Sequence, residues 1–475
     1  MNRRSGRICA RLSGLLLIAL LSGCGAGLRT PWHPQSVATP GHWTVSLPAA
    51  GSALTTAQPW PHGFNDPALA RFIEQALTHN HDLARAGLRL YQARLQTELT
   101  RRSQQPQLAA SLDIAGAGGA GREAWRDRGI PTASVTYQAD LWGKLASQRD
   151  EAHWRASASA EDLAQTRLEL IAEASGLYWR TGEMNARLAL SRQQLADAER
   201  TEALVAARYT AGAVSRIELA QARQQRLGQL GQLRALEQQR RELLNAQSVL
   251  LGLPPGSIAV EPEALPAAPL PPVRADLPAE VLARRPDLRA AEDRLRATLA
   301  KADTARLALY PTLTLTDSLG GSSDALVQFL HNPITSAVAQ LTLPFVQWRQ
   351  LGVSRDIAYN DYQQSVLDFQ QTLYKALAAV DNALNRRLEL QLQREQLNAS
   401  LAQARLAARL NGIRYREGEI ALQIWLEAQA QERQAERDLA QNRLETYLNL
   451  ADLWRLTGGD QPLDNSAAAR AVEQS

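Results

Sequence analysis

The sequence predicts an α+β protein in which one plan of long helices and short strands is built twice. Three observations support this prediction: an internal repeat that spans most of the chain, two pairs of short alternating segments, and two very long helical segments without proline. The alternating segments have the period of strands and about the 9–11 residues that a tilted membrane strand needs. The expected fold class is therefore an α+β membrane protein made of two internal repeats.

The internal repeat keeps a nearly constant register. Asp82-Leu83 returns as Asp287-Leu288 after 205 residues, and Trp142 returns as Trp348 after 206 residues. Further pairs at the 206-residue offset are Gln165-Thr166 with Gln371-Thr372, Arg208-Tyr209-x-x-Gly212 with Arg414-Tyr415-x-x-Gly418, and Gly252 with Gly458. A duplication that stays in register over this length predicts one structural plan repeated around a pseudo-two-fold axis.

Residues 1–23 predict a secretory leader. Four arginines precede a short apolar run, Leu15 to Leu21, which is too brief for a helix that crosses a bilayer. The run is followed by Ser22, Gly23 and Cys24, and this resembles the bacterial lipoprotein signal, in which the cysteine is acylated and becomes the mature N-terminus. The alternative is an ordinary leader with an incidental cysteine. We expect Cys24 to be acylated and the protein to be transferred to the outer membrane.

Removal of the leader balances the charge of the chain. The full sequence has 52 Lys and Arg against 48 Asp and Glu, and the leader contains four of the arginines, so 48 remain against 48. A neutral mature chain gives no argument for nucleic-acid binding. Only one cysteine remains after the leader, so the mature chain can form no internal disulfide.

The mature chain divides into five segments by composition and repeat. The first repeat is expected to start with one long helix, Pro67 to Arg102, because apolar residues recur there at helical spacing without a proline. Prolines between the repeats predict an extended connection rather than a domain. The segments are a tether from the lipid to the body, the first repeat, the connection, the second repeat and a tail, at residues 24–62, 63–253, 254–276, 277–460 and 461–475.

Each repeat contains a predicted β-hairpin. After Pro106 the apolar period changes to two, and a glycine-rich turn region, Gly116 to Gly129, leads to a second alternating run up to Leu141. The second repeat has the same pair of runs at Thr312 to Leu319 and Thr335 to Phe345. Alternation of this kind predicts strands with one apolar face.

A helical segment without proline follows each hairpin, at Ala146 to Ala211 and Gly352 to Glu417. At about 1.5 Å per residue each would extend roughly 100 Å, which no compact domain needs. Each is expected to turn at a glycine, Gly212 or Gly418, and to return as a second helix that ends near the next repeated glycine.

Strands and helices of this kind both require neighbours. Four strands cannot close into a barrel, and open strand edges are not tolerated in lipid, where no water can pair with the backbone. The chain must therefore pool its strands with copies of itself, unless its strands lie outside a membrane. Trp142 and Trp348, between strand and long helix in each repeat, are expected at the membrane interface of such an assembly. Plain packing is the alternative for either tryptophan.

In order and spacing, these motifs resemble the TolC-like outer membrane factors, in particular the acylated branch that works with resistance-nodulation-division efflux pumps. The resemblance covers essentially the whole mature chain and rests on Cys24, the two Asp-Leu pairs, the run Asp140 to Gly143 and the two Arg-Tyr-x-x-Gly turns. It implies a homotrimeric outer-membrane β-barrel continued by a long α-helical periplasmic tunnel. The implied function is the passive channel of a tripartite efflux pump, with a periplasmic adaptor and an inner-membrane pump as partners.

The resemblance also assigns roles near the turns. It implies that the adaptor docks at Arg208, Tyr209, Gly212, Arg414, Tyr415 and Gly418. Beyond the turns the tunnel of the family narrows at rings of acidic side chains. The gate residues implied here are Glu218 and Glu427, with Ile424 where the family often has an acid and Arg216 as a latch. Ordinary capped turns and solvated helix residues are the alternatives.

Enzyme chemistry finds little support in the sequence. The glycines of Gly116 to Gly121 match a dinucleotide fingerprint, but too few residues follow before the next strand for the required crossover helix. His79 and His81 have no further ligand for a metal and are expected to cap a helix junction. We predict no enzyme, cofactor or metal site. The alternative function is a lipid-anchored periplasmic coiled-coil scaffold or adaptor, and the cargo of a channel is left open among drug, metal ion, dye and peptide.

Overall fold

The computed structural model describes residues 28–34, 40–45, 60, 64, 66–117, 126–257, 260–266, 278–320 and 334–459. The leader, Cys24 and the tail after residue 460 lie outside the described residues. The chain forms two compact units. We call residues 1–37, 87–162 and 287–372 the sheet unit, and residues 38–86, 163–286 and 373–475 the helical unit.

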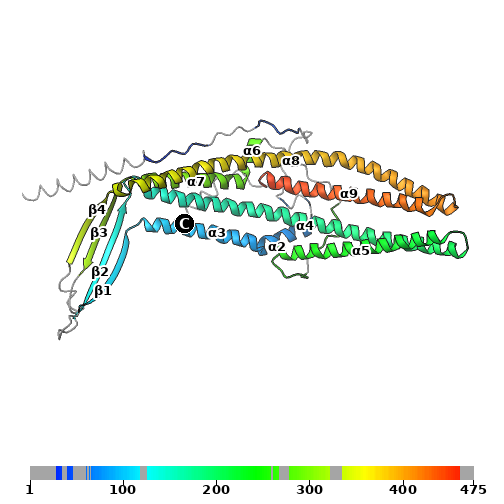
Figure 1. Ribbon diagram of the computed structural model, residues 1–475, viewed down its shortest axis with the longest axis horizontal. Coiled ribbons are helices and arrows are strands. Elements are labelled where there is room, and N and C mark those ends of the chain that lie inside the picture. Colours follow the sequence, from blue (N-terminus) through cyan, green and yellow to red (C-terminus); the bar gives the residue numbers. More distant parts are fainter. Residues whose placement is uncertain are drawn as a thin grey trace, which may run out of the picture. The chain divides into compact units, whose positions relative to one another are not determined.

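The sheet unit contains one antiparallel sheet (Figure 1). Its strands are β1 (Gln107–Ala117), β2 (Arg126–Ala139), β3 (Thr312–Gly320) and β4 (Ile334–Thr342), in the order β1-β2-β3-β4. Each repeat supplies one hairpin, and β2 pairs with β3 across the repeats. The antiparallel hairpin of β1 and β2 confirms the prediction and leaves no room for a dinucleotide-binding crossover. Within one chain, β1 and β4 are the edges of the sheet.

Several predicted strand limits are wrong. β1 extends to Ala117, past the expected start of the turn at Gly116, and β2 ends at Ala139 rather than Leu141. The expected turn region ends too late, because β2 already begins at Arg126 and Gly129 pairs with Ile114 of β1. Ladder pairing outweighs the poor strand propensity of the glycine. The last predicted strand is too long: β4 ends at Thr342, and Phe345 lies in the 3-10 helix η4 (Pro344–Gln347). Pro344 has no backbone N–H to donate to a ladder, so the strand stops before it.

Long helices adjoin every strand of the sheet. α3 (His81–Ser103) precedes β1, α4 (Lys144–Thr210) follows β2, α7 (Pro286–Leu307) precedes β3, and α8 (Trp348–Glu417) follows η4. The return helices are α5 (Arg216–Leu250) and α9 (Leu422–Leu456), as predicted. The described part of the chain contains no helix that is both long and apolar enough to cross a membrane.

The helical unit has an aromatic core. Trp179 of α4 is fully buried and lies 5.1 Å from Phe64 and 5.2 Å from Tyr447 of α9, measured between ring centroids. Trp60, from the segment expected to be a tether, stacks on Trp454 at 5.0 Å. The end of that segment is therefore packed into the helical unit.

The prediction of one helix from Pro67 to Arg102 is wrong. α2 (Pro67–His79) ends at Asn80, whose backbone is extended, and α3 starts directly after it. The Oδ1 atom of Asn80 accepts hydrogen bonds from the N–H groups of Asp82 and Leu83, at 2.9 and 3.0 Å. A side chain that caps a helix start satisfies amide groups that the helix leaves unpaired. A helix junction exists here as expected: Asn80 caps the start of α3, and Nδ1 of His79 lies 3.0 Å from the carbonyl oxygen of Gln75 in the last turn of α2.

The same break occurs in the second repeat, where α6 (Pro278–Arg284) is followed by α7. Asn80 donates a hydrogen bond to the carbonyl of Leu250 at 2.9 Å, and the buried Arg285 donates one to the carbonyl of Leu456 at 3.1 Å. Leu250 and Leu456 end α5 and α9. Each break is thus tied to the end of a return helix, although the two repeats use different residue types.

The repeated glycines after α5 and α9 have a structural reason. Gly252 and Gly458 have φ angles of +66° and +88°. A Cβ atom at either position would lie 2.8 Å from a backbone carbonyl oxygen, that of His79 or Arg284. Both the backbone conformation and the close approach therefore require glycine.

We expect Gly458→Ala to lower the free energy of unfolding by at least about 1 kcal/mol, because the methyl group meets backbone and φ is positive. The control is Gly228→Ala in α5, where a Cβ atom has nothing within 4 Å. That change should stabilise the helix by about 0.5–1 kcal/mol. Denaturant unfolding followed by circular dichroism compares the two, and equal stability of both variants would contradict the account.

Candidate functional site at the helix turns

The two hairpins of the helical unit end in the same backbone turn. Gly212 has a φ angle of +72°, and the N–H groups of Gly212 and Ala213 donate to the carbonyls of Tyr209 and Arg208 at 2.9 Å each. The turn after α8 repeats this at Gly418, with φ of +83° and equivalent bonds of 3.1 and 2.9 Å. This pattern is the Schellman motif, which pairs the last carbonyls of a helix. The predicted turning points are confirmed.

An apolar cluster joins the two hairpins beneath these turns. Its buried members come from all four helices: Val205, Leu219, Ala222, Tyr415 and Leu422. Burial of these side chains brings the ends of α4, α5, α8 and α9 together. The turns of the two repeats therefore form one surface within the helical unit.

Arg208 of α4 contacts the end of α8. Its guanidinium donates to the carbonyl of Tyr415 at 3.2 Å and to that of Arg416 at 2.8 Å. It also lies over the Tyr415 ring, 5.2 Å from the centroid. A cation at the C-terminal carbonyls of a helix is favourable because those groups carry partial negative charge. Arg208 therefore fastens one hairpin to the other.

The two Arg-Tyr-x-x-Gly motifs have different surroundings. Tyr415 is 2% exposed, whereas Tyr209 is 41% exposed. Arg414 forms an exposed ion pair with Glu419 at 3.1 Å rather than a contact with the other hairpin. The identical residues of the two motifs gave no sequence signal for this difference.

Tyr415 connects the cluster to a predicted gate residue. Its hydroxyl group lies 3.4 Å from Oε2 of Glu218 and donates toward it. Burial raises the pKa of Tyr415, while the nearby Arg208 acts against this rise and the Glu218 carboxylate adds to it. Tyr415 is therefore a neutral hydrogen-bond donor at physiological pH.

Trp425 and Gly412 belong to this site and were missed in the sequence. The Trp425 ring stacks on Tyr415 at 5.3 Å. A Cβ atom at Gly412 would lie 2.9 Å from Nε1 of Trp425, so the indole fits only against glycine or after a shift. A glycine within a long helix was the available signal, because it often marks close packing.

The other predicted gate residues lie on exposed surfaces. Glu427 accepts a hydrogen bond from Gln423 at 2.8 Å, and Ile424 is 46% exposed. Arg216 is exposed, and among the residues described it has no acidic partner within a single chain. Only Glu218 is half-buried, and its N–H group bonds to the capping Ser215 at 3.4 Å.

Trp142 and Trp348 also differ within one chain. The Nε1 atom of Trp142 donates to the carbonyl of Pro311 at 2.7 Å, and its ring lies 5.4 Å from Tyr310. Trp348 begins α8 and is 58% exposed. Both lie where a strand gives way to a helix, as predicted.

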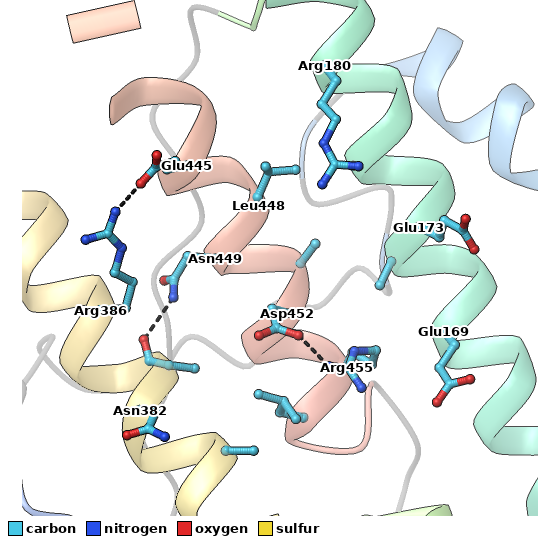
Figure 2. Close-up of a pocket in the computed structure, with 16 residues that line it drawn as sticks. Glu169, Glu173, Arg180, Asn382, Arg386, Glu445, Leu448, Asn449, Asp452 and Arg455 are labelled. Carbon is cyan, nitrogen blue, oxygen red and sulfur yellow. Dashed lines mark hydrogen bonds and ion pairs between the residues drawn. The ribbon is translucent and has the colours of Figure 1, made fainter. Parts of the chain in front are cut away.

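An open groove of about 840 Å³ lies between α4, α8 and α9 in the helical unit (Figure 2). Two ion pairs lie along it, Arg386 with Glu445 and Arg455 with Asp452, and Glu169, Glu173 and Arg180 of α4 also line it. Asn449 at its floor donates to the carbonyl of Ala383 at 2.9 Å. Among the described residues, no group of His, Cys, Asp or Glu is placed to hold a metal ion.

Comparison with known proteins agrees with this arrangement. The family model described as "Outer membrane efflux protein" matches residues 72–253 and 277–459. The pyoverdine export outer membrane protein OpmQ of Pseudomonas putida is 29% identical over 448 residues, 92% of this chain and 95% of the relative. The probable outer membrane lipoprotein SilC of Salmonella typhimurium is 26% identical, over 81% of this chain and 84% of the relative.

A solved structure has the same fold. The outer-membrane channel OprN superposes with a TM-score of 0.80 at 25% identity, covering 90% of this chain and 99% of that one. The family model matches well over half of the present sequence and both of its repeats. The chain belongs to the outer membrane efflux protein family.

Proposed function

We propose that this protein is the outer-membrane channel of a tripartite efflux pump and works as a homotrimer that exports small toxic compounds passively. The observation that carries the proposal is the open sheet. In the part of the chain that the structure describes, β1 and β4 each have one unpaired edge, and large apolar side chains on the strands are exposed, Leu108 to 78%. Free edges cannot remain in lipid, so β4 of one chain would pair with β1 of the next until a barrel closes.

Exposed apolar side chains on the helices beside the edge strands support the same assembly. α3, which precedes β1, exposes Leu88, Tyr91, Leu95 and Leu99 at helical spacing. α8, which follows β4, exposes Val353 and Ile357. The two edges of one chain thus offer different apolar surfaces, and contact between unlike surfaces closes a ring when the rotation fits.

The partners follow from the function of such a channel. A passive duct needs an inner-membrane pump for energy, here of the resistance-nodulation-division type, and a periplasmic adaptor between pump and channel. The name of OpmQ states that it exports pyoverdine, which is a property of that relative. For this chain we propose only that the pump selects the cargo, because a wide water-filled tunnel discriminates weakly.

Lipid attachment at Cys24 is part of the proposal. The leader ends in Leu-Ser-Gly-Cys, and the name of SilC describes a lipoprotein. Trp142 and Trp348 would then lie at the inner membrane interface, where indole rings are favoured. Mass spectrometry of the mature N-terminus tests the attachment: an acylated Cys24 supports it, and an unmodified N-terminus at another residue contradicts it.

We expect the purified protein to migrate as a trimer in detergent without heating and to conduct ions in planar bilayers. The physical reason is that one chain supplies too few strands for a closed barrel. Gel migration with and without boiling, together with single-channel recording, measures both properties. A monomer that conducts no ions would favour the coiled-coil scaffold instead.

The turns at Gly212 and Gly418 are proposed as the docking surface for the adaptor, together with Arg208, Tyr209 and Arg414, while the buried Tyr415 supports this surface from within. Gly212→Asp or Gly418→Asp should leave the trimer intact but reduce crosslinking to the adaptor, because positive φ strains any side chain. The control is Gly228→Asp, at a helical position with open space around it. Unchanged crosslinking in both turn variants would argue against docking at this surface.

Glu218 and Glu427 are proposed as acidic rings of the resting gate, with Ile424 as an apolar ring and Arg216 as a latch that pairs with a neighbouring acid and holds the helices. Three copies of each acid around one axis would attract multivalent cations. We expect the double variant Glu218→Ala, Glu427→Ala to weaken block by trivalent cations and to raise single-channel conductance.

The matched control is Glu199→Ala, which removes an exposed carboxylate of α4 away from the turns. Tyr415→Phe tests the position of the Glu218 side chain separately from its charge. The variant leaves the carboxylate in place and keeps the Tyr415 ring, but it removes the hydroxyl that contacts Glu218. Wild-type block and conductance in the double variant would show that the acids do not form the gate.

A further inference from the structure

The described residues nearest to the N-terminus are docked on the sheet unit. Thr30 donates two hydrogen bonds to Asp303 of α7: its N–H group to Oδ2 at 2.8 Å and its hydroxyl to Oδ1 at 2.7 Å. Asp303 is 5% exposed and also accepts a bond from Arg306 at 2.8 Å. A buried carboxylate needs such donors, because an unpaired charge in the interior is very unfavourable.

The same short segment reaches α4 as well as α7. Arg306 contacts the carbonyl of Leu28, and Arg29 forms an ion pair with Asp150 of α4. The Arg296 guanidinium of α7 lies between two indole rings, 4.9 Å from the centroid of Trp32 and 4.6 Å from that of Trp154 of α4. Residues 28–32 therefore connect two helices through polar, ionic and cation–π contacts.

A second contact of the N-terminal segment uses the same chemistry in the helical unit. Thr44 donates its N–H group and its hydroxyl to Oδ1 of Asp381 in α8, at 2.9 and 2.8 Å. This contact is exposed, whereas the one at Asp303 is partly buried. The chain thus provides a matched control for any change at Asp303.

We propose that residues 28–32 form a strap that fixes the mature N-terminus to α4 and α7, so that the lipid is held at a defined place instead of on a loose tether. Cys24 precedes Leu28 by four residues, which limits their separation to about 14 Å for an extended chain. β3 starts five residues after α7 ends, so this part of α7 adjoins the sheet in sequence. Docking of the strap stands independently, and placement of the lipid rests on the proposed acylation of Cys24.

Trypsin can report on the strap, because Arg29 lies within it and cleavage there releases the peptide from Cys24 to Arg29. The full-length protein in detergent is digested briefly, and this peptide is quantified by mass spectrometry. Asp303→Asn keeps the shape of the side chain and removes its charge. Loss of the charge weakens both hydrogen bonds from Thr30, so cleavage after Arg29 should be faster by about tenfold or more.

Asp381→Asn makes the same change at the second contact and should leave cleavage after Arg29 at the wild-type rate. Trp32→Ala removes one ring from the strap without altering α7, and it should also accelerate cleavage. If Asp303→Asn does not fold, Trp32→Ala decides alone.

Unchanged cleavage in the strap variants, or equal acceleration by Asp381→Asn, would overturn the strap. The mass of the released peptide tests the acylation of Cys24 separately from the docking of residues 28–32. A peptide that carries acyl chains supports a positioned lipid. An unmodified peptide whose cleavage still depends on Asp303 keeps the strap and overturns both the placement of the lipid and the acylation of Cys24.

Discussion

Backbone pairing at the edges of a four-stranded sheet is the constraint on which the rest of the structure depends. Among the described residues of one chain, β1 and β4 have a partner strand on one side only, and large apolar side chains on the strands are exposed. In water such edges would invite aggregation, and in lipid they are not tolerated at all. Assembly with further copies satisfies both edges at once. Each edge strand adjoins a long helix in sequence, so the proposed assembly would also bring the exposed apolar residues of these helices against a neighbouring chain.

The duplication shows which features the backbone imposes and which the side chains are free to change. Gly212 and Gly418 have the same φ region and the same hydrogen bonds, because the turn cannot form otherwise. In contrast, the equivalent hydrogen bond to the last carbonyl of a return helix comes from Asn80 in one repeat and from Arg285 in the other. Of the four repeated Arg and Tyr residues at the turns, Arg208 and Tyr415 make the described contacts with the opposite hairpin, whereas Tyr209 is exposed and Arg414 pairs with Glu419 of its own hairpin. The two repeats therefore contribute different contacts to the surface that their turns form together.

Much of the fold could be predicted from the sequence, because helix length, strand alternation and terminating glycines are local signals. A junction was expected beside His79 and His81, but the role of Asn80 in it was missed, because the bond from Asn80 to the carbonyl of Leu250 joins residues that lie 170 positions apart. The early start of β2 was missed because ladder pairing, rather than composition, places Gly129 in a strand. The turn residues were identified, but not the burial that separates Tyr415 from Tyr209. The docking of residues 28–32 carried no periodic signal, because single side chains such as Thr30 and Trp32 make its contacts.

The most direct test of the central claim is disulfide pairing between chains. After the leader only Cys24 remains, so Cys24→Ser gives a background for a panel of cysteine pairs with one position in β1 and one in β4. Cysteines at Thr136 and Thr316, which face each other within one chain, are the control and should give linked monomers only. If copies pool their strands, some edge pairs should give disulfide-linked dimers and trimers on non-reducing gels. If every edge pair in protein from native membranes remains monomeric while the control pair forms its disulfide, the strands do not complete a shared barrel.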